Sequence, residues 1–578
     1  MVVRHPAMEA GSSRRYVPNL WDVFAFALIL TLLILVYEGS RETFAPLVSL
    51  QQHPVSLDPA HLPEYALRTT LRMLAAMVAS LLFTFAYGSL AAKNRRAEQI
   101  LVPLLDILQS VPILGFISFT VVGFMALFPG KVMGAELAAI FAIFTSQAWN
   151  MTFSFYQSLK TVPADLLEVS RGFRLSPWQR FWRLEVPFSM PGLVWNTMMS
   201  MSGGWFFVVA SEAISVGSHT IVLPGVGSYV ALAIEQRDLH AIAWAVGAML
   251  AVILLYDQLL FRPLVDWSRK FRVELTASDS EEHSWLLVLI RRSRMVSSGL
   301  APVSGFLSLL VRRRAGTVRR QRARRGFPRA AAWVDRSWQI AVGVVSLFMI
   351  WHIVSFVSTG VSWLEVSRVL ALGLITLSRV LVLTAIATLI WVPVGVWIGL
   401  RPRVAERVQP LAQFLAAFPA NLMFPFVVAA IVRWHLAPDI WLSPLMVLGT
   451  QWYILFNVIA GASAFPGDLK EAASNFHVSG WNWWRKVILP GVFPYYVTGA
   501  ITATGGSWNA SIVAEVASWG NTTLRAHGLG AYIAQATSEG DFPRVVLGIV
   551  VMTLFVTLLN RALWHPLYHY AHRQLRLG

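Results

Sequence analysis

Two charged stretches of the chain carry the residue types that could do chemistry at a surface. They run over residues 163–187 and 466–490, and each begins with Pro and holds acids, bases and more than one Trp. Pro and an acid two residues later suit the first turn of a helix, because Pro loses no hydrogen bond there and the negative charge meets the positive end of the helix dipole. Since hydrocarbon cannot hold so many charges, both stretches are predicted to be loops at a membrane surface.

Each loop is predicted to form a helix with a narrow apolar face and a charged face. The apolar face follows the spacing i, i+3, i+4 and i+7 in both loops. Its members are Leu166, Val169, Ser170 and Phe173 in the first loop and Leu469, Ala472, Ala473 and Phe476 in the second. The charged faces indicate ion pairing across a protein interface, and the alternative is a pair of amphipathic helices without a partner.

The second loop resembles the cytoplasmic loop of binding-protein-dependent ABC importer permeases, which reads Glu-Ala-Ala, three residues, Gly, nine residues and Ile-x-Leu-Pro. Residues 471–473 and 487–490 fit at the full spacing, and residues 168–170 and 184–187 fit more loosely. Two copies at matched positions rarely arise by chance, which favours the resemblance over unpartnered helices. Where the family carries Gly, this chain has Arg174 and His477, so we expect the turn to be made in another way.

The resemblance implies partners and roles. Six loop residues are implied to couple the chain to an ATPase: Asp165, Glu168, Arg171, Asp468, Lys470 and Glu471. Two cytoplasmic ABC ATPase subunits, one under each loop, would hold the ATP and magnesium, and a periplasmic or lipid-anchored solute-binding protein would deliver the solute. The chain has no Walker A motif, because Gly130-Lys131 precedes Val132 and neither Gly-Lys-Ser nor Gly-Lys-Thr occurs. We expect a permease subunit that is not an enzyme, with no catalytic residue, metal site or cofactor of its own.

Composition indicates a membrane protein with many spans. Of the 578 residues, 56% are hydrophobic and 13% are charged, whereas soluble domains carry about a quarter charged residues. The formal net charge of +17 fits basic loops on the cytoplasmic side, and no aromatic residues interleave the arginines as nucleic-acid binding would require. The absence of Cys excludes disulfides, thiolate metal sites and cysteine nucleophiles.

Twelve apolar runs of spanning length occur in two sets of six. The first set lies near residues 21–37, 67–92, 100–127, 134–157, 190–212 and 242–261, and the second near 338–356, 372–400, 408–432, 440–462, 492–515 and 545–563. The polar N-terminus has no cleavage site after the first run, so we predict a retained span.

The two sets are predicted to be copies. Residues 103–112 mirror 410–419 at an offset of 307, as do Thr69 and Thr376. After a short insertion, matched residues differ by 303: Glu168, Trp178, Glu212, Gly225, Gly227, Asp238 and Pro263 pair with Glu471, Trp481, Glu515, Gly528, Gly530, Asp541 and Pro566. Such self-similarity indicates duplication.

The expected fold class is an all-α polytopic membrane protein with two parallel six-helix repeats. An even number of spans gives both copies the same orientation, with the pseudo-two-fold axis along the membrane normal. Basic residues gather on the side of the two loops, so both loops and both termini are predicted to lie in the cytoplasm of a bacterium, at its inner membrane. The predicted domains are residues 1–274, a basic connector over 275–335, and residues 336–578.

The connector has no counterpart in the repeat. Short apolar pieces at 285–290 and 303–311 precede an arginine-rich run over 312–325. These pieces are too short to span, so we predict interfacial helices with arginines against anionic headgroups, and a disordered basic tether is the alternative. Deletion of residues 284–325 is expected to spare both bundles.

Uncharged polar residues inside the spans are candidates for a solute pathway. They are Gln109, Gln147, Trp149, Asn150 and Asn196 in the first copy and Gln413, Asn421, Gln451, Asn457 and Asn509 in the second. For each of them, a hydrogen bond that holds two helices together is the alternative.

Matched acids near the outer surface refine the resemblance. Glu212 and Glu515 each precede a Gly-x-Gly sequence and follow a Trp, a pattern similar to the nitrate, sulfonate, taurine and bicarbonate branch of these permeases. This implies a small oxyanion as solute, although fusion of two permeases in one chain departs from the branch. A permease for a neutral or cationic molecule such as a vitamin precursor is the alternative. An ion-coupled secondary transporter would need intramembrane ionisable groups, of which the spans offer few.

Two matched arginines lie where spans begin on the outer side. Arg72 and Arg379 are interpreted as snorkelling anchors, with attraction of an anion as the alternative. Glu212 and Glu515 are equally compatible with structural acids.

Overall fold

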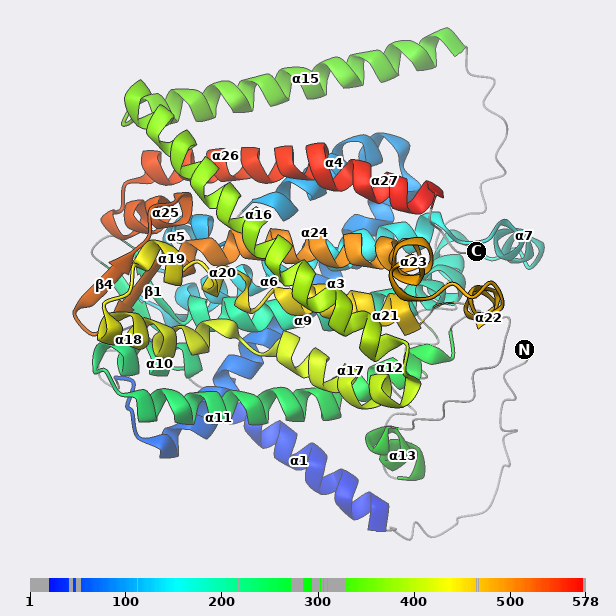
Figure 1. Ribbon diagram of the computed structural model, residues 1–578, viewed down its shortest axis with the longest axis horizontal. Helices are drawn as coiled ribbons and strands as arrows, with labels where there is room; N and C mark the ends of the chain where they lie inside the picture. Colours follow the sequence, from blue (N-terminus) through cyan, green and yellow to red (C-terminus); the bar gives the residue numbers. More distant parts are fainter. Residues whose placement is uncertain are drawn as a thin grey trace.

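The structure is a computed structural model in which long helices run side by side (Figure 1). It describes residues 20–40, 45–47, 54–111, 113–216, 219–271, 284–293, 328–463, 465 and 467–574, and the isolated residues 302, 305 and 309. The predicted connector piece at 303–311 and the arginine-rich run therefore lie largely or wholly outside the described residues. The all-α polytopic fold class is confirmed.

The first copy contains most of its predicted spans as helices. Its elements are α1 (Leu20–Ser40), η1 (Pro59–His61), α3 (Leu62–Lys93), α4 (Arg95–Ser110), α5 (Ile113–Leu127), α6 (Val132–Lys160), α7 (Ala164–Gly172), α8 (Pro177–Arg180), η2 (Phe181–Glu185), α9 (Val186–Ser211), β1 (Ala213–Val216), β2 (His219–Val222), α10 (Val226–Glu235), α11 (Leu239–Tyr256), η3 (Asp257–Phe261) and α12 (Arg262–Arg269). Strands β1 and β2 form an antiparallel hairpin.

The second copy repeats this order after the connector helix α13 (Trp285–Arg292). Its elements are α15 (Pro328–Ser358), α16 (Trp363–Gly399), α17 (Pro402–Ala417), η4 (Ala420–Met423), α18 (Phe424–Trp434), α19 (Pro438–Trp441), α20 (Leu445–Leu448), α21 (Gln451–Ser463), α22 (Gly467–Asn475), α23 (Gly480–Trp483), η5 (Trp484–Ile488), α24 (Leu489–Ala514), β3 (Val516–Trp519), β4 (Thr522–Arg525), α25 (Leu529–Glu539), α26 (Phe542–Leu559), η6 (Asn560–Trp564) and α27 (His565–Gln574). Strands β3 and β4 pair as β1 and β2 do.

Seven helices in the described residues are long and apolar enough to cross a membrane, and counting the bent pair 438–448 and 451–463 as one gives eight. The other four predicted spans correspond to α1, to the less apolar α9, and to the pairs α4–α5 and α17–α18. The continuous spans predicted at 100–127 and 408–432 are wrong, because each is broken. Val111 and Phe418 precede Pro112 and Pro419 and are extended, with ψ of 128° and 129°, since Pro pushes the preceding residue out of the helical region.

Backbone details show the duplication in three dimensions. Left-handed residues occur at Arg174 and His477 and again at Arg237 and Gly540, and both pairs are separated by 303 positions. Single π-helical turns also match: η2 pairs with η5, and η3 pairs with η6. Each copy thus preserves the same local departures from an α-helix.

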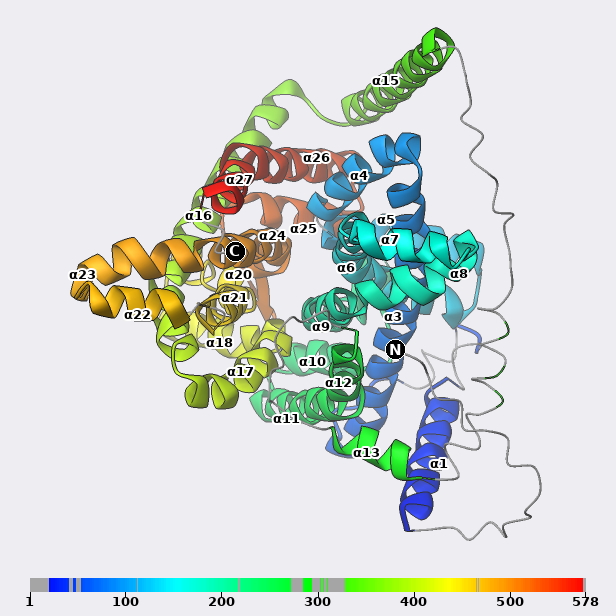
Figure 2. The same cartoon turned by 90° about the vertical axis from the view of Figure 1, so that its right-hand side faces the viewer.

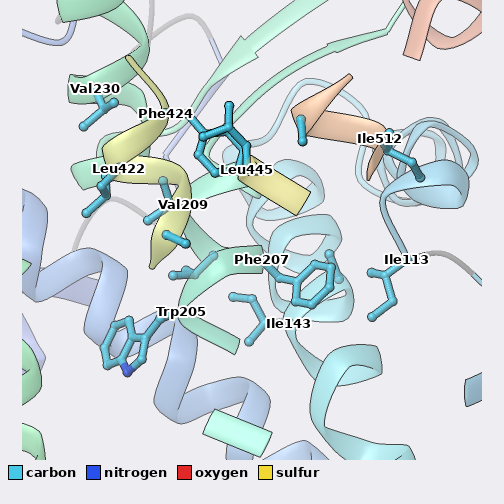
Figure 3. Close-up of a cluster of buried hydrophobic side chains, with 14 of the residues drawn as sticks. Ile113, Ile143, Trp205, Phe207, Val209, Val230, Leu422, Phe424, Leu445 and Ile512 are labelled. Carbon is cyan, nitrogen blue, oxygen red and sulfur yellow. The ribbon is translucent and has the colours of Figure 1, made fainter. Parts of the chain in front are cut away.

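The two copies share one hydrophobic core. Figure 3 shows Ile143, Trp205 and Phe207 of the first copy in the same cluster as Leu445 and Ile512 of the second. Packing between the copies is reciprocal, because α4 and α5 lie against α26 while α17 lies against α9 and α11. The copies therefore form one unit in the described residues.

Two peripheral helices differ in how they are held. The apolar part of α15, residues 337–358, has no buried residue. The helix lies at the edge of the bundle in Figures 1 and 2. Helix α13 instead packs Leu286 and Leu289 against Ala25 of α1, and Ser293 Oγ donates a hydrogen bond of 2.8 Å to the buried Asp22. Removing residues 284–293 would lose these contacts. The dispensable part of the connector is therefore predicted to begin after Ser293.

The loop helices end in the left-handed turn that Gly would favour, so the expectation that Arg174 and His477 make the turn in another way is wrong. Arg174 and His477 both have φ of 50°, and Val478 N donates to Ala473 O at 2.9 Å just as Leu175 N donates to Ser170 O at 3.1 Å. This hydrogen-bond pattern is that of a Schellman motif, whose left-handed position favours Gly.

Replacing His477 by Gly should therefore stabilise the end of α22. The left-handed conformation costs a residue with Cβ roughly 1–2 kcal/mol. Gly removes this strain, although the greater conformational entropy of Gly in the unfolded chain offsets part of the gain in stability. We expect amide hydrogen exchange over residues 467–478 to slow in His477→Gly by several-fold. The control is Ser474→Gly, inside the helix, which should speed the exchange, and unchanged or faster exchange in His477→Gly would contradict the argument.

Candidate functional site

A buried ionic network lies at the hairpin end of the first copy, next to β1. Glu212, the C-cap of α9, accepts hydrogen bonds of 2.7 Å from Arg72 and from Thr69, both on α3. Arg72 also holds Glu136 of α6 through two hydrogen bonds, of 2.6 and 2.7 Å. Such a bidentate pairing is the strong form of an ion pair. Three helices are thus tied together by one guanidinium.

The Gly-x-Gly sequence lets the backbone come close to this carboxylate. Gly227 N donates to Glu212 Oε2 at 2.7 Å at the start of α10, where a helix N-terminus favours negative charge. A Cβ on Gly225 would lie 2.3 Å from the carboxyl carbon of Glu212, and a Cβ on Gly227 would lie 2.1 Å from Val209 O. Both glycines are therefore needed for the approach itself.

The second copy repeats the network with weaker geometry. Glu515 accepts from Thr376 at 2.8 Å and from Arg379 at 3.3 Å, and Arg379 donates to Asp439 at 3.1 Å. The side chain of Asp439 is 46% exposed, whereas that of the matched Glu136 is 11% exposed. Asp439 also contacts the ring of His527 at 3.0 Å. The second network is closer to solvent, so its charges interact more weakly.

The interpretation of Arg72 and Arg379 as snorkelling anchors is wrong. Arg72 has a relative exposure of 4% and pairs with two acids instead of reaching headgroups. Sequence reasoning also missed Glu136 and Asp439. A signal was present, because both acids lie within or just before an apolar run and differ by the repeat offset of 303.

Removal of Arg72 should cost far more stability than removal of Arg379. Arg72→Gln leaves two buried carboxylates without their cation, which costs roughly 3–5 kcal/mol, while Arg379→Gln affects a pair that is partly solvated. The measurement is the thermal unfolding midpoint of the purified protein in detergent, with Arg368→Gln on the exposed face of α16 as the control. Equal shifts for Arg72→Gln and Arg379→Gln would contradict the ranking.

A cavity of about 160 Å³ lies between the two copies, and four of the ten pathway candidates line it. The four are Gln109, Trp149, Asn150 and Asn509. The rest of the wall comes from α5, α6, α9, α17, η4, α20, α21 and α24. The wall of the cavity contains no charged side chain among the residues that the structure describes.

Five other candidates are not part of the cavity lining, and each of them makes a hydrogen bond to a neighbouring residue. Gln147 is fully buried against Met73 and Met201, and Asn196 bonds Ser154. Asn421 donates to Phe206 O, and Gln451 accepts from Trp391. Asn457 donates to Tyr453 O. The side chain of Gln413 lies outside the described residues.

The cavity offers hydrogen-bond donors and aromatic edges without fixed charge. Gln109 Nε2 donates to Asn150 Oδ1 at 2.9 Å, and Asn509 Oδ1 accepts from Ile113 N at 2.7 Å across the two copies. The buried Trp149 Nε1 has no hydrogen-bond partner in the described structure. Leaving a buried donor of this kind unpaired is costly.

The loop helices α7 and α22 lie at the end of the bundle opposite the hairpins (Figure 1), on two sides of it when viewed end-on (Figure 2). Asp165, Glu168, Arg171 and Glu471 are exposed, and Lys470 is partly buried. The side chain of Asp468 lies outside the described residues. Phe173 and Phe476, at matched positions, are exposed by 76% and 81%.

The first loop has an anchor that the second lacks. Glu185 of η2 is buried and pairs with Lys93 of α3 at 2.6 Å and with Arg180 at 2.9 Å. The matched residue of the second copy is the fully buried Ile488. The first loop is therefore fastened to its bundle by charge and the second by apolar packing.

These features define a class: a duplicated, all-helical, multi-pass membrane protein with a cavity between its copies and a pair of exposed helices at one end. The family profile described as "Binding-protein-dependent transport system inner membrane component" matches residues 63–262 and 391–563. The chain belongs to this family, and two ABC permease domains are fused in it.

Curated relatives match about a third of the chain. The bicarbonate transport system permease protein CmpB of Synechococcus elongatus is 28% identical over 186 residues, which are 32% of this chain and 64% of the relative. The nitrate import permease protein NrtB of Leptolyngbya laminosa is 28% identical over 32% of this chain and 63% of its own length. The glycine betaine/proline betaine permease protein ProW of Escherichia coli is 28% identical over 33% and 50%. The match thus spans less than two thirds of the length of each of these relatives.

Proposed function

We propose that this chain is the membrane subunit of an ABC importer that moves a small oxyanion of the nitrate, sulfonate, taurine or bicarbonate type into the cytoplasm. Family membership supports the permease class, and relatives named for bicarbonate and nitrate support the solute. Transport would proceed by ATP-driven alternating access of the cavity between the copies. ATP and magnesium would bind to partner subunits.

One observation carries the proposal most: the two loop helices have the same exposed groups at matched positions. Glu168 and Glu471 would each pair with a basic residue of an ATPase subunit. Phe173 and Phe476 would each enter an apolar pocket of that subunit, and burial of such a side chain contributes roughly 1.5–3 kcal/mol. Two ATPase subunits, one for each loop, are therefore part of the proposal.

The orientation follows from charge. Basic residues near the loop helices support a cytoplasmic location of that end by the positive-inside rule, so both termini are proposed to be cytoplasmic and the hairpins to face the periplasm. A periplasmic or lipid-anchored solute-binding protein would dock on the hairpin end. The membrane is proposed to be the bacterial inner membrane.

The uncharged wall of the cavity also bears on the alternatives. Amides, hydroxyls and an indole can donate to an oxyanion without holding it too tightly to release. A neutral solute such as a vitamin precursor is compatible with the same wall and remains the second candidate. An ion-coupled secondary transporter is disfavoured, because the buried carboxylates Glu212 and Glu136 are already held by Arg72.

Reversing the charge of Glu471 should weaken coupling to the ATPase and leave the bundle folded. The residue is exposed on α22 and touches no core. We expect Glu471→Lys to weaken ATPase co-purification by about fivefold or more, since a lost ion pair costs about 1 kcal/mol. Asn482→Lys, exposed on α23, is the control. Unchanged co-purification together with unchanged transport would sink the assignment of the loop.

Binding of the solute to the permease alone should be weak. Nitrate, sulfonates and bicarbonate would be titrated into the purified protein without its binding protein. We expect dissociation constants above about 1 µM, equivalent to less than about 8 kcal/mol of binding. Tighter binding, or a preference for a cation, would overturn the oxyanion proposal.

A further inference from the structure

A second, larger cavity lies to the side of the central one. It has a volume of about 330 Å³, within the range of ligand sites. Its walls come from α9, from α11 with η3, and from α17 and α21 of the other copy. Figure 2 shows α17 beside α11 near the edge of the bundle. We call this cavity the lateral pocket.

The interior of the lateral pocket is apolar and soft. Met198, Met199 and Met201 line it together with the buried rings of Trp205 and Phe456. Methionine side chains adapt to irregular flexible ligands because they are unbranched and polarizable. The lining therefore fits a flexible hydrocarbon better than a rigid polar solute.

The mouth of the pocket faces the bilayer. Leu254 of α11 and Leu411 of α17 both line the pocket and are exposed by 51% and 54%. In a membrane protein, apolar side chains so exposed on two neighbouring helices are suited to contact with lipid. A hydrocarbon chain can thus enter sideways between α11 and α17.

One end of the pocket is charged and lies at the membrane boundary. Helix α11 has 18 residues, so about 27 Å separate its outer end from η3, close to the thickness of the hydrocarbon core. There Asp257, Gln258 and Arg262 line the pocket, and Arg262 Nε donates to Asp257 at 3.1 Å. The guanidinium has five N–H donors in all, and a fork of donors suits phosphate oxygens.

The second copy does not repeat this chemistry. The positions that match Met198, Met199 and Met201 hold Ile501, Thr502 and Thr504, while Asn560 and His565 replace Asp257 and Arg262. The combination of a methionine-rich interior with a charged end thus belongs to the first copy.

We propose that the lateral pocket binds an anionic phospholipid of the cytoplasmic leaflet, with one acyl chain among the methionines and the phosphate at Arg262. In the proposed orientation, the η3 end of α11 lies on the cytoplasmic side, where the leaflet is rich in anionic lipid and a basic residue at its surface attracts such lipid. Ser202 and Ala416 line both the lateral pocket and the central cavity. A bound chain therefore touches the wall of the central cavity and sets the spacing of α9 and α17, which belong to different copies.

The test is photo-crosslinking in phosphatidylcholine vesicles that hold the full chain and a trace of phosphatidylglycerol with a diazirine in its acyl chain. We expect adducts on Met198, Met201 or Ile253 in excess of those on the lipid-exposed α15. Labelling should fall several-fold in Ala417→Phe, which fills the pocket, and in Arg262→Gln at its exposed mouth. Arg561→Gln, on the matched helix of the second copy, should leave labelling unchanged.

Three results would overturn the proposal. Pocket labelling no greater than that of α15 would show that no lipid resides there, and labelling that persists in Ala417→Phe would show that adducts form outside the pocket. Because Ala417→Phe could fail to fold, Arg262→Gln serves as the second variant. Equal labelling by a phosphatidylcholine probe, unaffected by Arg262→Gln, would refute the role of the phosphate.

Discussion

The hairpin end of the bundle depends on the burial of one carboxylate. Glu212 has no exposed surface, and a charge in such a place is tolerable only when hydrogen bonds and an opposite charge surround it. Arg72, Thr69 and the start of α10 provide both. Glu212 ends α9, its partners lie on α3 and at the start of α10, and Arg72 also holds Glu136 of α6. Satisfying this charge therefore fixes how the four helices meet, and the close glycines follow from the same requirement.

Sequence reasoning found what is local or repeated and misjudged what depends on tertiary contacts. The loop helices follow from a Pro, an acid and an apolar spacing, and the duplication follows from constant offsets. The partners of Arg72 lie 64 and 140 positions away, so nothing near it in the chain distinguishes a buried cation from a snorkelling one. Likewise, only the fold decides that Trp149 lines a cavity while Gln147, two residues before it, is sealed between helices.

Some errors had readable causes. Pro112 and Pro419 occupy matched places, and the rule that Pro extends the residue before it would have broken both spans. The prediction of another turn after each loop helix rests on residue preference alone. The hydrogen bonds that close the helix instead impose the left-handed conformation on Arg174 and His477. Geometry set by many contacts can override the preference of one residue.

The matched π-helical turns carry information about history. A π-turn accommodates one more residue per turn than the helix around it, so it records a single-residue insertion in an α-helix. Turns η2 and η5, and likewise η3 and η6, stand at the same offset of 303. Two independent insertions at each of two matched places would be an improbable coincidence. A common ancestor of the two halves that already had both turns accounts for the match, whereas Glu185 and Ile488 mark a place where the two halves differ.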